Sequence, residues 1–291
     1  MSGRMLSVRP FPLKDELLSS WFVRLAHSNG DKVQNLAFRA FGRAQRFVNM
    51  GDMDRGGRLR METILSAITG VSLERVQATS LAAYQGWLWA EASVRGPRRW
   101  VMPVGDQQHR RVGYSLQACT ECLKEPVPYF RRSWRLAFQV VCPYHGVRLI
   151  DRCPACGEPL AIHRGDVGTF TPEVDSSVRW CARCKADLAE DFGATQREED
   201  AVVDFQWLVL ETLSRGWINI DGRVVHSTLF FDGLWMLWNF LDAPAWSGRM
   251  RALLEKEGIN LPNPSENRFG GINVRSLPAR HQLLVATGWL L

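Results

Sequence analysis

Apolar residues near the N-terminus recur at the three- and four-residue spacing of an amphipathic helix. The first stripe comprises Leu17, Leu18, Trp21, Phe22 and Leu25. It ends at the polar turn 28–30, after which a second stripe comprises Val33, Leu36, Ala37 and Phe41. The pattern therefore predicts two helices joined by a tight turn.

A second unit of the same kind follows. Its first stripe comprises Ile64, Leu65 and Ile68, and its second comprises Leu73, Val76 and Leu81. The turn between them contains Gly70, and Ser72 is placed to cap the second helix. Both units have the pattern of a helix-turn-helix, which can contact DNA but which any helical hairpin shares.

The C-terminal third of the chain is also predicted to be helical. One apolar stripe before Gly216 comprises Val203, Phe205, Trp207, Leu208, Leu210 and Leu213, and a later one comprises Phe230, Phe231, Leu234, Leu237, Trp238 and Leu241. An apolar helix is predicted over residues 277–291. Residues 86–111 are rich in Trp, Arg, Gly and Pro and lack a helical period, which predicts a connector of strands and loops.

The cysteines change this picture, because all seven lie between positions 119 and 184. With one histidine they form four pairs separated by two residues: Cys119 and Cys122, Cys142 and His145, Cys153 and Cys156, and Cys181 and Cys184. A two-residue spacer lets a tight turn aim both side chains at one ion. Eight ligands satisfy two tetrahedral zinc sites with no cysteine left over.

The pairing of these ligands has two solutions. Sequential pairing gives one zinc to Cys119, Cys122, Cys142 and His145 and the other to Cys153, Cys156, Cys181 and Cys184, and it is the favoured solution. An interleaved pairing is the alternative, since spacing identifies ligands better than it identifies the ion each one holds. Four protein ligands leave no open position for water, so two structural rather than catalytic Zn²⁺ ions are expected.

These patterns predict a mainly α fold with small zinc-ribbon β elements, divided into three parts. Residues 1–113 would form a helical domain of the helix-turn-helix kind, and residues 114–195 a tandem zinc-binding module. Residues 196–291 would form a C-terminal helical domain, which begins after an acidic boundary at 190–200.

Composition places the chain among folded soluble proteins. Hydrophobic residues make up 46% and charged residues 23% of the sequence, close to ordinary globular values. No apolar run approaches the roughly 20 residues of a membrane helix, and the first residues lack the apolar segment of a secretory signal. We therefore expect a cytoplasmic protein without a membrane partner.

The formal net charge of +6 is too small to establish nucleic-acid binding by itself. Arginines nevertheless gather around the helical units and the first zinc pair, and arginine suits contact with phosphate. The candidate contact residues for nucleic acid or an acidic partner are Arg39, Arg43, Arg98, Arg99, Arg131 and Arg132. The competing interpretation is a solvated basic face that binds nothing.

Several stretches together resemble the TniQ family of transposon proteins, to which TnsD-type target selectors are related. The N-terminal part of the likeness is carried by Pro12, Glu16-Leu17-Leu18-Ser19-Ser20-Trp21, Arg24-Leu25-Ala26 and Asn29-Gly30. Its most specific part is carried by Cys119, Cys122, Tyr129, Arg131, Trp134, Cys142, His145, Leu149 and Cys153-Pro154-x-Cys156. Phe230-Phe231-x-Gly233-Leu234 continues it, so that the likeness spans most of residues 10–240.

This resemblance implies an adaptor for transposition. TniQ-like proteins connect a target-recognition signal, from a CRISPR effector complex or a DNA site, to a AAA+ ATPase of the TnsC or TniB kind that recruits a transposase. The resemblance also implies a possible homodimer. The chain is shorter at its C-terminus than TnsD-type members, which favours the adaptor role over autonomous recognition of a DNA site.

A second function class stays open, namely a stand-alone DNA-binding regulator that uses zinc ribbons and a helix-turn-helix. An enzyme is the least favoured class. The sequence has no phosphate-cradling P-loop and no recognisable nucleophile motif, and its predicted metal sites are closed.

Overall fold

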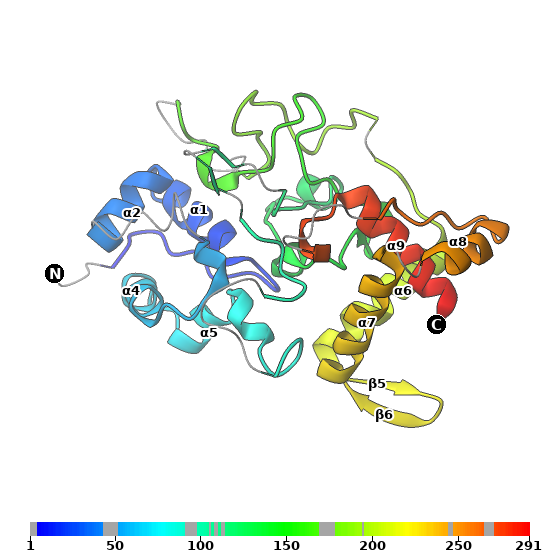
Figure 1. Ribbon diagram of the computed structural model, residues 1–291. Helices are drawn as coiled ribbons and strands as arrows, with labels where there is room; N and C mark the ends of the chain where they lie inside the picture. The colour runs from blue at the N-terminus through cyan, green and yellow to red at the C-terminus, as the bar shows by residue number, and fades with distance from the viewer. Residues whose placement is uncertain are drawn as a thin grey trace. The chain divides into compact units, whose positions relative to one another are not determined.

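The computed structural model describes residues 5–42, 52–90, 98–104, 106–107, 110–111, 114–168, 178–193, 195–243, 247–264 and 271–291. The described chain is mainly helical, and its three sheets have two strands each (Figure 1). This confirms the predicted fold class. The chain divides into two compact units, and each is described by itself.

The first unit comprises residues 1–83, 104–135 and 150–194. Its helices are α1 (Leu18–Ser28), α2 (Val33–Phe41), α4 (Leu59–Thr69) and α5 (Leu73–Gln77). Both predicted helical hairpins are present, α1 with α2 and α4 with α5. Leu17, Leu18, Trp21 and Phe22 are fully buried, so the apolar stripe of α1 forms the core of this unit.

The second hairpin differs from the prediction at its C-terminal end. Ser72 caps α5 by accepting a hydrogen bond from Arg75 N–H, as expected. The helix nevertheless ends at Gln77, and Leu81 begins the separate 3₁₀ turn η3 (Leu81–Tyr84). The hydroxyls of Thr79 and Ser80 donate to carbonyls of the preceding turn at 2.6 and 2.8 Å, and such local side-chain bonds compete with continuation of the helix.

Short elements complete the first unit. They are the 3₁₀ turns η2 (Met53–Arg55), η4 (Cys122–Lys124), η5 (Arg132–Arg135) and η6 (Ile162–Arg164) and the antiparallel strands β1 (Asp106–Gln107) and β2 (Arg110–Arg111). η6 packs against α1 and η2 packs against the same helix. Two short turns therefore pack on the first helix of the N-terminal hairpin.

A buried ion-pair network fastens η5 to η2 and α1. Arg135 is fully buried and donates to Asp52 at 2.8 Å and to Asp54 at 3.0 Å. Asp54 in turn accepts from the backbone N–H of Ser19 at 2.7 Å and from its hydroxyl at 3.0 Å. Burial raises the pKa of Asp54, and the neighbouring Arg135 guanidinium opposes that increase.

The second unit comprises residues 84–103, 136–149 and 195–291. Its helices are α6 (Asp200–Arg215), α7 (Ser227–Asp242), α8 (Ser247–Lys256) and α9 (Leu277–Leu290), with the 3₁₀ turn η7 (Gly271–Val274). Strands β3 (Val141–Cys142) and β4 (Val147–Arg148) form one hairpin. Strands β5 (Trp217–Ile220) and β6 (Arg223–His226) form another, in register Trp217 with His226, which projects beyond α6 and α7 (Figure 1).

Aromatic side chains form the core of the second unit. The buried ring of Trp100 meets Phe138, Trp235 and Trp238 edge to face at centroid distances of 5.3, 5.0 and 5.2 Å. Its indole N–H donates to the carbonyl oxygen of Phe231 at 3.1 Å. Such rings bury large apolar areas, so one tryptophan from the predicted connector holds α7 in place.

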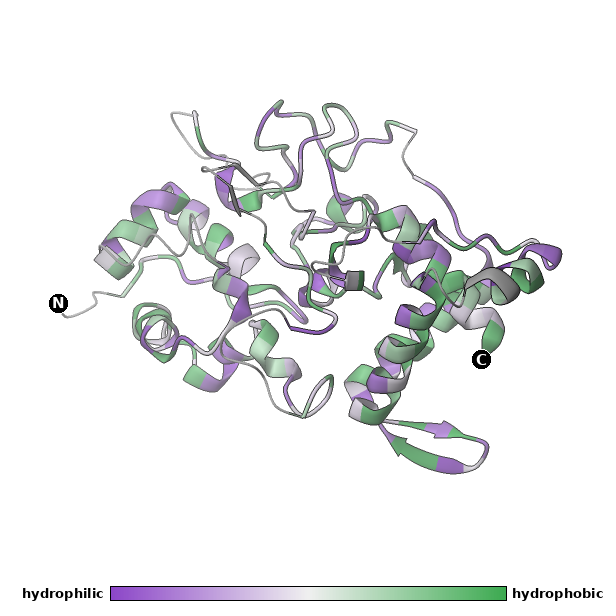
Figure 2. Cartoon of the chain, in the orientation of Figure 1, coloured by the Kyte–Doolittle hydropathy of each residue, from purple (hydrophilic) through white to green (hydrophobic). Residues whose placement is uncertain are grey.

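The helices are amphipathic rather than uniformly apolar. Hydrophobic and hydrophilic residues are mixed along α7 (Figure 2). In the described part of the chain, each helix is too short or too polar to cross a lipid bilayer.

The boundary between residues 194 and 195 lies close to the predicted end of the zinc module, whereas residues 136–149 group with the C-terminal helices. The predicted division into 1–113, 114–195 and 196–291 concerns independent folding, which this grouping does not test. It stays a prediction.

Replacing Arg135 should destabilise the protein strongly. Arg135→Ala leaves the buried Asp54 carboxylate without a counter-charge, and breaking a buried pair in this way costs about 3–5 kcal/mol of unfolding free energy. Urea unfolding measures the difference. Arg39→Ala is the control, because the Arg39 side chain is 59% exposed and solvent screens its pair with Asp31, which should contribute about 1 kcal/mol or less. Equal stability of the two variants would contradict the assigned role.

Candidate metal centres

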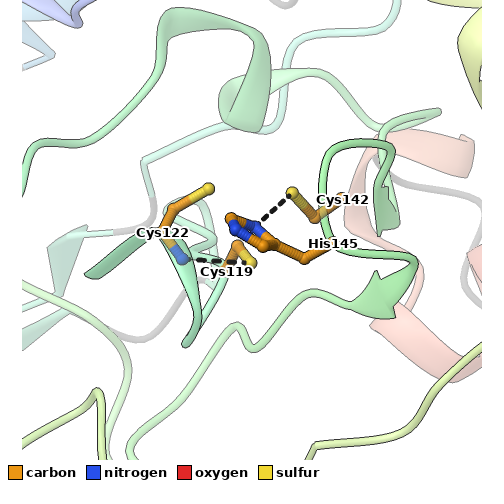
Figure 3. Close-up of side chains that lie close together, drawn as sticks. All are labelled: Cys119, Cys122, Cys142 and His145. Atoms are coloured by element: carbon orange, nitrogen blue, oxygen red, sulfur yellow. Dashed lines mark hydrogen bonds between the residues drawn. The ribbon is translucent and has the colours of Figure 1, made fainter. Parts of the chain in front are cut away.

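The first ligand cluster brings Cys119, Cys122, Cys142 and His145 together. One ligand atom from each residue lies within 4.8 Å of every other. The four side chains point toward one another, and Cys142 Sγ and His145 Nδ1 are 3.6 Å apart (Figure 3). The three cysteines are buried and the histidine is half-buried.

Backbone hydrogen bonds shape each half of this cluster. Ala118 and Ile150 exchange backbone hydrogen bonds of 2.9 and 2.8 Å immediately before Cys119, and the N–H of Cys122 donates to Cys119 Sγ at 3.4 Å. In the other half, Cys142 ends β3, and its carbonyl accepts from Gly146 N–H at 2.8 Å. The local turns thus aim the paired side chains at a common point.

The second cluster comprises Cys153, Cys156, Cys181 and Cys184. The sulfur atoms of Cys153 and Cys184 are 3.6 Å apart, and those of Cys156 and Cys181 are 3.7 Å apart. The eight residues therefore gather in the sequential sets and not in interleaved ones.

The two knuckles of the second cluster have the same hydrogen bonds. Cys153 N–H donates to Glu158 O at 2.8 Å, and Cys181 N–H donates to Ala186 O at 2.9 Å. The residue after each second cysteine returns a bond to the first cysteine's carbonyl, from Gly157 at 2.8 Å and from Lys185 at 3.1 Å. Each knuckle is thus a closed loop with both sulfurs on one side.

The residue after the second ligand adopts the left-handed region in three of the four knuckles. Gly146 and Gly157 have φ of 62° and 71° there, which glycine adopts without steric cost. Lys185 has φ of 61° in the same place, although a side chain with a Cβ is disfavoured in this conformation. The lysine therefore stands where the other two knuckles have glycine.

The spacing of ligand atoms fits a tetrahedral metal ion. Zinc lies about 2.3 Å from thiolate sulfur, which places two sulfurs of a tetrahedron about 3.8 Å apart. The observed separations of 3.6 and 3.7 Å are close to this value and far from the S–S bond of a disulfide, and none of the seven cysteines, all of them among the described residues, forms a disulfide. Both clusters could accordingly hold a metal ion, with four protein ligands each.

The clusters differ in exposure and in how their thiols ionise. Cys156 and Cys184 are exposed, whereas the cysteines of the first cluster are all buried. In the absence of an ion, burial raises the pKa of Cys153 to about 12, whereas the Ala186 N–H lowers the pKa of Cys184 to about 7. Metal binding needs thiolates and releases their protons, so affinity increases with pH.

Arg131 lies beside the first cluster. Its Nη2 is 3.9 Å from Cys122 Sγ, and Nη1 donates to the Tyr129 hydroxyl at 2.8 Å. The guanidinium also lies over the Tyr129 ring at 4.9 Å. Three thiolates and one divalent ion would leave a net negative charge, which this cation is placed to offset.

The arginines that were predicted to contact a partner differ in how exposed their side chains are. Arg39 and Arg99 have side chains 59% exposed, paired with Asp31 and Asp232. Arg98 is buried, and the side chains of Arg131 and Arg132 are 12% and 18% exposed. Arg43 lies outside the described residues. Arg98, Arg131 and Arg132 offer little surface to a partner, and the binding role of the whole group stays a prediction.

The sequence analysis assigned no role to three polar residues, His27, Asp166 and Lys185. His27 and Asp166 meet at 3.0 Å although 139 positions separate them, and no local pattern indicates such a pair. Lys185 had a detectable signal, because alignment of Cys181–Lys185 with Cys153–Gly157 places the lysine opposite a glycine.

Removing Arg131 should weaken metal binding at the first cluster. Loss of such an outer hydrogen bond and charge lowers affinity by about 10- to 100-fold. Competition with a chromophoric chelator measures the effect in Arg131→Ala. Lys124→Ala is the control, because this nearby cation pairs with Glu121 at an exposed site. Unchanged affinity in Arg131→Ala would show that the arginine serves packing alone.

Comparison with known proteins gives one family. Residues 7–149 match the model of the TniQ family, and no curated protein matches the chain. The matched span contains both helical hairpins and the first cluster, whereas the second cluster and the stretch 230–234 lie beyond it. The likeness carried by the N-terminal residues and the first cluster is thereby confirmed, and this chain is a protein of the transposition-associated TniQ family.

Proposed function

We propose that the protein is a target-selection adaptor for transposition. It would link a target-recognition complex, formed by a CRISPR effector or a DNA site, to a AAA+ transposition ATPase and through it to the transposase. The observation that carries this proposal is the TniQ match over residues 7–149. The helical hairpins and the closed ligand clusters support it, because they offer binding surfaces and rigid turns rather than an open reactive centre.

We infer that both clusters hold structural zinc. A set of three thiolates with one imidazole, and a set of four thiolates, are ligand sets that zinc prefers. When bound, the ion would supply folding free energy, because its four ligands come together only in the folded chain. Four protein ligands at each ion leave no place for a reacting water, which favours a non-catalytic protein.

Arg39 and Arg99 are the residues that we propose for contact with an acidic partner or phosphate. Each has a largely exposed side chain whose guanidinium pairs with a carboxylate, that of Asp31 for Arg39 and that of Asp232 for Arg99. Arg43, in the chain beyond α2, is proposed with them on sequence alone. We also propose self-association as a homodimer, on the basis of the family likeness.

Metal analysis should find about two zinc ions per chain. Cys119→Ser and Cys153→Ser should each lower the content by about one ion, because each removes one ligand from a different four-residue site. Elemental analysis of protein purified without added metal measures this. A single variant that loses both ions would show that the two sites are not separate, and wild-type protein with no zinc would contradict the assignment.

The adaptor role predicts recruitment without catalysis. A double variant, Arg39→Glu with Arg99→Glu, should lower capture of the ATPase or the target complex about tenfold or more in a pulldown, and stability should change by less than about 1 kcal/mol. Arg183→Glu is the matched control, because its side chain is 58% exposed and also ion-paired.

Equal capture by the double variant and the wild type would remove these arginines from the interface. A second experiment measures binding of the purified protein to random duplex DNA. Nanomolar to micromolar affinity with a steep salt dependence, without capture of an ATPase, would instead favour the stand-alone DNA-binding regulator.

A further inference from the structure

A loop between the ligand pairs of the second cluster holds the α1 and α2 hairpin. Asp166, two residues after η6, accepts a hydrogen bond from Val33 N–H at 2.7 Å. Val33 is the first residue of α2. The N-cap residue of this helix is Lys32, and its side chain makes no capping hydrogen bond. A residue 133 positions away in sequence therefore caps the helix.

The same carboxylate also holds the last turn of α1. Asp166 Oδ2 lies 3.0 Å from His27 Nε2, and the two side chains are 2% and 1% exposed. Burial alone would raise the pKa of Asp166, but the bonds from His27 and Val33 outweigh it and hold that pKa below its usual value. The carboxylate is thus an ionised anchor between two helices. Figure 1 shows η6 beside α1, as the packing of these elements requires.

Lys185 fixes the backbone on both sides of Asp166. Its Nζ donates to the carbonyl oxygen of Gly165 at 2.7 Å and to that of Val167 at 3.3 Å. Lys185 directly follows the ligand Cys184 and closes its knuckle through the bond to Cys181. A continuous path therefore runs from the second cluster through Lys185 and Asp166 to the turn between α1 and α2.

The backbone of Lys185 gives independent support to this path. Its φ of 61° matches that of Gly157 in the partner knuckle, where glycine satisfies the conformation without a steric penalty. A lysine there is unfavourable for the local turn alone. The two hydrogen bonds of its ammonium group offset the steric cost of the left-handed backbone.

We propose that the second cluster is a metal-dependent clamp on the α1 and α2 hairpin, with Lys185 as the positioning residue that couples the ion to Asp166. The ion fixes the knuckle Cys181–Lys185, the lysine fixes residues 165–167, and Asp166 then caps α2 and holds His27. This rests on the proposed zinc at the second cluster. Loss of that ion would loosen the N-terminal hairpin, although none of the hairpin's own residues binds the metal.

Amide hydrogen exchange of zinc-loaded full-length protein tests the clamp, with the Val33 amide as the readout. Lys185→Gly keeps all eight ligands and relieves the backbone, so it should retain two ions per chain. Its Val33 amide should exchange about tenfold faster than in the wild type, the effect of losing a helix cap. Asp166→Ala should have the same effect, and the double variant should add nothing further.

Three further variants separate the explanations. Lys185→Asn tolerates a left-handed backbone but has a shorter side chain, so it should repeat the result of Lys185→Gly. Arg183→Ala removes a cation from the same knuckle and should leave Val33 exchange unchanged. Cys184→Ser should accelerate that exchange, whereas Cys119→Ser, in the other cluster, should not.

Wild-type exchange at Val33 in both lysine variants, with two ions bound, would overturn the clamp while leaving the zinc assignment intact. Additive effects of Lys185→Gly and Asp166→Ala would also overturn it, because the two residues would then act separately. Metal analysis of the wild-type protein is the separate readout. Fewer than two ions would refute the zinc assignment, and the clamp with it.

Discussion

Convergence of four side chains on one point is the constraint on which the centre of this protein depends. Each knuckle is a turn of five residues whose backbone bonds aim two ligands, and two knuckles must meet before a tetrahedral set is complete. An ion bound by either set would add its binding free energy to the stability of the fold, because the site is complete only in the folded chain.

Buried charged side chains connect short turns and loops of the first unit to its helices. Arg135 joins η5 to Asp54 and α1, and Asp166 joins the second cluster's loop to α1 and α2. A buried charge is costly unless it is paired, so each network is satisfied in few arrangements. These networks specify position as much as stability. Within the first unit they fix the positions of α1, α2, η2 and η5 relative to one another.

The predictable features were those encoded over short distances in the sequence. The ligand pairs follow from two-residue spacers, and α1, α2, α6, α7 and α9 follow from stripes such as Trp21, Phe22 and Leu25. Ser72 was identified as a cap because capping is local. The β5 and β6 hairpin was missed, since its strands are short and largely exposed and show no clean alternation.

Long-range polar contacts escaped sequence analysis for a different reason. In the sequence, Asp166 looks like an ordinary carboxylate of a loop. Only the folded structure places it against His27 and Val33. Arg131 was predicted as a surface contact because its charge is visible in sequence, whereas its position beside Cys122 is not. The sequence likewise left two ways to divide the ligands between the ions, and the structure groups them in the sequential sets.

Zinc K-edge X-ray absorption tests the central claim most directly, because it reads the ligand atoms themselves. Seven cysteines and one histidine shared by two ions predict an average first shell of sulfur with a minor nitrogen contribution and no oxygen. The sulfur distance should be about 2.3 Å. A first shell with substantial oxygen, or with fewer than about three sulfurs per zinc, would contradict two closed structural centres.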